Sequence, residues 1–263
     1  PCSAVGKQML RPIYKVPCWP GLAAAFDLQV RLAKWLCEPG TTQQGVTESG
    51  VRALCANIEV QDWLWQLLSL KSNRTPLLEY AHRLAAQPAT EKCRLRAWIE
   101  KASEIAVQFG PSPPSWLKPP KDLPNWPAFK ELMEAFYGRF ISLGLPFDAS
   151  GNPTASTRVT YTRFLNEFKH LHGDQACVMC GGYLSKPQVD HWIAKAAFPI
   201  LSVAPDNILP ICYECNVKPC KGDKPVFSAQ GHHAFAEWFH PFHRPGYGRI
   251  NPAFDNHTLH VRP

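Results

Sequence analysis

The stretch CVMCGGYLSKPQVDHWIAKAAFPILSVAPDNILPICYECNVK, residues 177–218, decides how this chain is interpreted. It contains two Cys-x-x-Cys pairs, Cys177 with Cys180 and Cys212 with Cys215, and 31 residues separate them. Two intervening residues let both thiolates of a pair reach one ion, and four thiolates satisfy tetrahedral Zn²⁺. The pattern therefore predicts a structural zinc site with these four cysteines as ligands.

Other uses of cysteine fit the sequence less well. A redox motif would need one pair in a βαβ context, and a disulfide scaffold would need a secreted protein. Cys220 is a fifth thiol near the two pairs, and we interpret it as spare. The remaining cysteines are isolated and are expected to be small buried hydrophobic residues: Cys2, Cys18, Cys37, Cys55 and Cys93.

Polar residues suited to hydrolysis lie between the pairs and just after them. Asp190 offers a hard oxygen ligand for Mg²⁺ or Mn²⁺, and its neighbour His191 can act as a general base near neutral pH. Adjacent side chains on a strand point to opposite faces, so the two can serve one site only near a strand end, a turn or a bulge. Asn207 lies on the approach to a second expected strand, and Asn216 opens a short expected helix. A second oxygen ligand there would complete a one-metal site.

The run VDHW (189–192), followed by DNILPICYECNVK (206–218), resembles the HNH (ββα-metal) nuclease motif in its variant with four zinc cysteines. The resemblance covers only about residues 177–224. It implies that His191 activates water, that Asp190 and Asn216 hold the catalytic ion, and that Asn207 fixes the loop that orients His191. It also implies that Lys218 neutralises phosphate. The third position of the motif is often histidine in the family, and Asn216 stands there in this chain.

The same resemblance implies an enzyme, a DNA endonuclease that leaves 5′-phosphate and 3′-hydroxyl ends and cuts one strand per active site. RNA stays open as a substrate. Stand-alone proteins of this kind resemble bacterial restriction or antiviral defence effectors. The alternative is a zinc-stapled module that binds nucleic acid, or another partner, without cutting it.

The rest of the chain predicts helices separated by one proline-rich segment, which has seven prolines between 110 and 127. Thr75 is expected as the N-cap of one helix, with Pro76 in its first turn. The expected fold is mainly α with a small α+β unit: a helical domain at 1–109 for recognition, a partner or regulation, a linker at 110–127, and a ββα-metal nuclease domain at 128–263. The expected helices cover 21–38, the run VRALCANI (51–58) capped by Thr47 and Glu48, 60–70, 75–87, 90–109, 128–145 and 157–173.

The composition of the chain indicates the kind of partner and the cellular compartment to expect. The 263 residues carry a net charge of +7, which suits a polyanionic partner but is weak evidence alone. No run approaches 18 apolar residues and the first residues lack the apolar core of a signal peptide, so a soluble cytoplasmic protein is expected. The sequence does not indicate an oligomeric state.

The tail after the motif is rich in histidine and aromatic residues. Residues 231–249 are expected to form an aromatic helix that packs on the ββα unit, and 258–261 are expected to add an edge strand. The alternative for the tail is a second metal site with ligands drawn from His232, His233, His240 and His243.

Overall fold

The structure is a computed structural model. It describes residues 13–110, 118–172, 177, 178, 184, 187–217 and 240–243, together with the backbone of 251–255 and 258–262. The described part is mainly helical, with three two-stranded antiparallel sheets. Cys180, Lys218, Cys220, His232 and His233 lie outside the described residues, as does most of the expected helix at 231–249.

The α-helices are α1 (Trp19–Leu36), α2 (Glu48–Arg52), α3 (Ile58–Ser69), α4 (Leu77–Ala85), α5 (Ala89–Ala102), α6 (Ile105–Gln108), α7 (Trp126–Ser142), α8 (Tyr161–His172) and α9 (Tyr213–Asn216). The 3-10 turns are η1 (Gln43–Gly45), η2 (Pro199–Leu201) and η3 (Pro205–Asn207). The strands are β1 (Lys71–Ser72), β2 (Thr75–Pro76), β3 (Gln188–His191), β4 (Ile208–Ile211), β5 (Asn251–Asp255) and β6 (Thr258–Arg262). In the described part of the chain, no helix combines the length and the apolar character needed to cross a bilayer.

Most expected helices are present, but several bounds were wrong. The helix expected at 90–109 is two helices, α5 and α6, and the one expected at 157–173 begins at Tyr161. The side chain of Thr47 caps α2 as expected, but that helix ends at Arg52. Thr75 does not cap α4. It pairs with Ser72 across the short β1–β2 hairpin, whose turn is formed by Asn73 and Arg74 at positive φ, so α4 begins only after Pro76. Thr75 is therefore part of the β1–β2 hairpin and not the helix cap that local propensity predicted.

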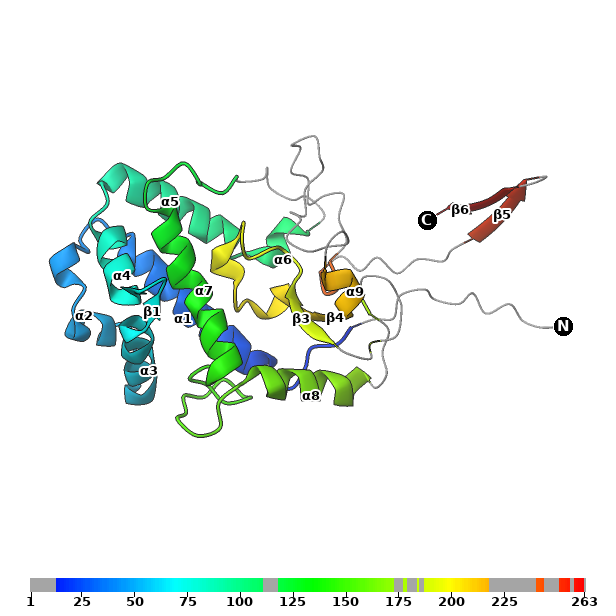
Figure 1. Cartoon of the computed structure of the whole chain (residues 1–263), viewed down its shortest axis with the longest axis horizontal. Coiled ribbons are helices and arrows are strands. Elements are labelled where there is room, and N and C mark those ends of the chain that lie inside the picture. Colours follow the sequence, from blue (N-terminus) through cyan, green and yellow to red (C-terminus); the bar gives the residue numbers. More distant parts are fainter. Residues whose placement is uncertain are drawn as a thin grey trace.

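Helix α7 is the central element of the described fold. It packs against α1, α3, α4, α8 and η2, and in Figure 1 it lies between the N-terminal helices and the β3–β4 hairpin. Its buried face carries Phe129, Leu132, Met133, Phe136 and Phe140 at helical spacing. The buried apolar side chains form one cluster that includes residues from Val16 to Cys215. The proposed boundaries at 109 and 127 stay a prediction.

Trp98 of α5 joins the helices to the chain that leads into η2. Its ring lies 5.3 Å from Trp126, 6.1 Å from Phe129 and 5.7 Å from Phe198, measured between ring centroids. Aromatic pairs at this spacing add to the gain from burial. The segment between β3 and β4 is therefore packed directly on the helical core.

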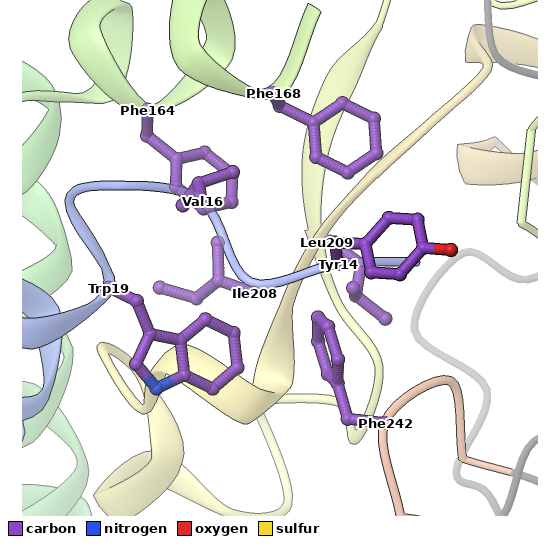
Figure 2. A pocket seen from close by; sticks show the side chains of 8 residues that line it. All are labelled: Tyr14, Val16, Trp19, Phe164, Phe168, Ile208, Leu209 and Phe242. Atoms are coloured by element: carbon purple, nitrogen blue, oxygen red, sulfur yellow. The ribbon is translucent and has the colours of Figure 1, made fainter. Parts of the chain in front are cut away.

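Apolar side chains also hold β4 in place. Figure 2 shows aromatic side chains from the N-terminal segment, α1, α8 and residue 242 gathered around Ile208 and Leu209. The cavity between them measures about 10 Å³, roughly the space of one water molecule. It is too small for a ligand, so the contacts serve packing. The full lining is Tyr14, Val16, Trp19, Phe164, Phe168, Ile208, Leu209 and Phe242.

Strand β6 contains the residues expected to form an edge strand, 258–261. It pairs with β5 in an antiparallel hairpin, from Asn251 opposite Arg262 to Asp255 opposite Thr258.

Candidate functional site

Three of the four expected zinc ligands meet at the start of α9. The Sγ atoms of Cys177, Cys212 and Cys215 all lie within 4.8 Å of one another, and all three residues are at most 9% exposed. Cys212 is the N-cap of α9, and its backbone N–H donates to Cys177 Sγ at 3.3 Å. Burial raises the pKa of the Cys212 thiol to about 11.

This cluster fits a metal ion. Bonds of about 2.3 Å in a tetrahedral zinc site place the sulfur atoms about 3.8 Å apart, which the observed grouping allows. Soft, buried sulfur donors favour zinc over magnesium or calcium. The described residues therefore supply three ligands for an ion such as zinc, and Cys180, the fourth expected ligand, lies outside them.

Strands β3 and β4 form the hairpin on which the remaining candidate residues stand. Asp190 lies opposite Leu209, and His191 lies opposite Ile208. The short α9 follows β4 and contacts β3. Asn216 was expected to open this helix but is its last residue, because the helix already begins at Tyr213. The order strand, strand, short helix is that of a ββα unit, although its elements have only four residues each.

Asp190 and Asn216 lie on the same side of β3. Asn216 Nδ2 donates to Gln188 Oε1 at 2.7 Å, and Gln188 and Asp190 share a strand face because they are two residues apart. Both strand residues are partly exposed, whereas Val189 and His191 are buried. Since the Asn216 amide nitrogen contacts Gln188, its oxygen is the atom suited to bind a cation.

His191 is the last residue of β3, and its side chain lies on the buried face of the strand with that of Val189, opposite to the face of Asp190. Its Nε2 lies 2.8 Å from the carbonyl oxygen of Ser202. A carbonyl can only accept, so Nε2 carries the ring proton and Nδ1 is the basic nitrogen of the neutral ring. The residue is 5% exposed, and the ring of Tyr137 packs edge-on against it at 4.5 Å.

Asn207 ties together both ends of the loop between β3 and β4. Its Oδ1 accepts from Ile193 N at 2.6 Å, and its Nδ2 donates to Ile193 O at 2.9 Å and to Leu201 O at 3.1 Å. The residue is fully buried. The structure therefore places Asn207 where it fixes the loop that contains Ser202, the hydrogen-bond partner of His191.

Two tyrosines that the sequence analysis did not identify hold β3 from the other edge. Trp192 N donates to Asn207 O across the hairpin, and hydrogen-bonded pairs alternate along an antiparallel ladder, so the peptide groups of Val189, which lies opposite Pro210, face away from β4. There, Val189 N donates to Tyr161 Oη at 3.3 Å, and Tyr137 Oη donates to Val189 O at 3.2 Å. Burial, together with the nearby Tyr161 and Asp190, raises the pKa of Tyr137. In the sequence, both tyrosines looked like ordinary aromatic positions of amphipathic helices.

Two histidines of the tail lie near this unit. His240 is fully buried, and its Nδ1 accepts from the backbone N–H groups of Phe242 and His243. Burial and the neighbouring His243 lower the pKa of His240 to about 3. The His243 ring pairs with Asp206. Among the described residues, only the cysteine cluster brings three or more histidine, cysteine or acidic ligand atoms together, so the second metal site gains no support.

A hollow of about 320 Å³ lies between α1, α6 and the chain around η3, where Pro205 and Asp206 line it. Asp190, His191 and Asn216 do not line this hollow.

Comparison with known proteins found no match to this chain among family models, curated proteins or solved structures.

Proposed function

We propose that this chain is a metal-dependent endonuclease of the HNH type that hydrolyses phosphodiester bonds of DNA. The observation that carries the proposal is the arrangement on the β3–β4–α9 unit. Asp190 and Asn216 lie on one side of β3, and the His191 ring at the end of that strand has its proton held on Nε2. The cluster of Cys177, Cys212 and Cys215 supports the zinc site of this motif, because it could hold a metal ion.

In this proposal, His191 is the general base. The Ser202 carbonyl holds Nε2–H, so Nδ1 is the atom that takes a proton from the attacking water. Asn207 keeps the loop that bears this carbonyl in place. Asp190 and Asn216 would hold Mg²⁺ or Mn²⁺, and Lys218 would neutralise phosphate. A bound divalent ion supplies Lewis-acid stabilisation of the phosphate and of the leaving oxygen.

The remaining assignments belong to the same proposal. Cys177, Cys180, Cys212 and Cys215 would hold a structural zinc ion. One site of this kind cuts one strand per event and leaves 5′-phosphate and 3′-hydroxyl ends. A role in bacterial restriction or antiviral defence fits a small nuclease unit attached to helices of unassigned function.

One observation favours the alternative, a zinc-stapled nucleic-acid-binding module without catalysis. A general base must come within hydrogen-bond reach of water, and His191 is only 5% exposed beneath Tyr137. A buried histidine bonded to a carbonyl is also a common structural feature. The two functions differ in whether DNA is cut or only bound.

A plasmid assay separates them. Purified protein with Mg²⁺ or Mn²⁺ is expected to nick supercoiled plasmid, and His191→Ala is expected to abolish nicking while zinc content is retained. His82→Ala is the matched control, because His82 Nε2 also contacts a backbone carbonyl, Val46 O, at 2.9 Å. DNA binding without cleavage in any divalent ion would establish the alternative. Equal cleavage by wild type and His191→Ala would refute the assigned base.

A further inference from the structure

A buried glutamine of α1 reaches the loop that contacts His191. Gln29 is fully buried, and its Nε2 donates to Ser202 Oγ at 2.7 Å and to Met133 O at 2.8 Å. Its Oε1 is also buried and has no hydrogen-bond partner among the described residues. An unpaired buried oxygen costs stability, so an apolar side chain would serve packing better at this position.

Ser202 connects this glutamine to the imidazole. The residue is fully buried, and its Oγ donates to Met133 O of α7 at 2.7 Å. Its own carbonyl oxygen is the atom that His191 Nε2 contacts at 2.8 Å. Ser202 therefore links α1 to His191: its side chain accepts from Gln29, and its carbonyl oxygen contacts the His191 ring.

The two neighbouring residues Leu201 and Ser202 are held by different partners. Asn207 binds the Leu201 carbonyl, while Gln29 and α7 bind the side chain of the next residue, Ser202. Fixing both neighbouring residues leaves the Ser202 peptide little freedom to rotate. The direction of its carbonyl, and with it the orientation of the His191 ring, is thereby set from the helical half of the chain.

We propose that Gln29 and Ser202 are positioning residues that hold the His191 imidazole in its working orientation. The inference rests on the proposed function for its catalytic consequence. It gives α1 a role that the sequence did not predict: through Gln29, this helix helps to fix the loop whose carbonyl orients the His191 ring.

Kinetics with matched variants test the catalytic part. Gln29→Met and Ser202→Ala are each expected to lower kcat by about 10- to 100-fold with little change in KM, because small misplacements of a catalytic group slow the chemical step. The double variant is expected to lose much less than the product of the two single losses, since both act through one network. Gln87→Met is the control: Gln87 is also buried, donates to a backbone carbonyl and has an unpaired Oε1, but it lies at the end of α4.

A second measurement needs no cleavage. The His191 Nε2–H proton, identified by its disappearance in His191→Ala, is expected to exchange slowly with water in the wild type. Exchange should be faster in Gln29→Met and Ser202→Ala and unchanged in Gln87→Met. Unchanged exchange in the first two variants would overturn the inference whether or not the protein cuts DNA. If the wild type cleaves, kcat values of both variants equal to that of Gln87→Met would overturn it as well. Absence of cleavage by the wild type would refute only the proposed function.

Discussion

The hydrogen bonds of Asn207 give the sharpest prediction about stability. Asn207→Ala removes three hydrogen bonds from a fully buried residue and leaves the N–H and the carbonyl of Ile193 without their partner, whereas the Leu201 carbonyl keeps its bond from Ala204 N. A hydrogen bond contributes about 1 kcal/mol net, and a buried group left unpaired costs about 1–3 kcal/mol. We therefore expect the free energy of unfolding to fall by about 3–5 kcal/mol, a large part of the 5–15 kcal/mol usual for a domain.

Urea unfolding followed by tryptophan fluorescence measures this loss, with an unchanged slope as evidence that only stability changed. Asn57→Ala is the control. The side chain of Asn57 caps α3 through the N–H groups of Glu59 and Val60 at an exposed helix start, where such a change costs about 1 kcal/mol. If Asn207→Ala destabilised the protein no more than Asn57→Ala, Asn207 would not tie the loop as described.

Three further predictions concern the metal, the strand and pH. Cys212→Ser is expected to lose the bound zinc that metal analysis finds in the wild type, whereas Cys93→Ser, at an exposed position, retains it; zinc retained in both would contradict the cluster's role. Tyr137→Phe and Tyr80→Phe each remove one hydroxyl bond to a backbone carbonyl and should each cost about 1 kcal/mol. Only Tyr137→Phe should slow plasmid cleavage, and equal cleavage rates for the two variants would refute the role of Tyr137 at β3. Because the pKa of His240 is lowered to about 3 from an ordinary 6.5, the unfolded chain binds a proton between these values that the folded chain does not. The free energy of unfolding should thus fall as pH drops from 6.5 towards 3, by roughly 4–5 kcal/mol at most, and His240→Phe should flatten that fall; identical pH curves would contradict it.

The sequence predicted what depends on local spacing. The helical period identified α1 and α3, and the two Cys-x-x-Cys pairs predicted the cluster of which Cys177, Cys212 and Cys215 are described. Each of these signals lies within a few residues of the chain, where geometry follows directly from the backbone.

What the sequence did not predict depends on contacts between distant segments. Gln29 and Ser202 are 173 residues apart and show no motif. Tyr137 lies 52 residues before Val189 and resembles any aromatic residue on an amphipathic helix. Tyr137 can hold β3 only because α7 packs against that strand in the folded chain. Helical period and residue propensity describe α7 alone, so they do not predict this contact.

The dimensions of the hairpin explain why these distant contacts matter. Strands β3 and β4 have four residues each, and an isolated two-stranded hairpin of this size is at best marginally stable in water. Val189 forms its outward hydrogen bonds with tyrosines of α7 and α8. The loop that faces His191 is held by Gln29 of α1 and the Met133 carbonyl of α7. The strand that carries the candidate base is therefore too small to fix its own geometry, and the helices before it do so from both sides.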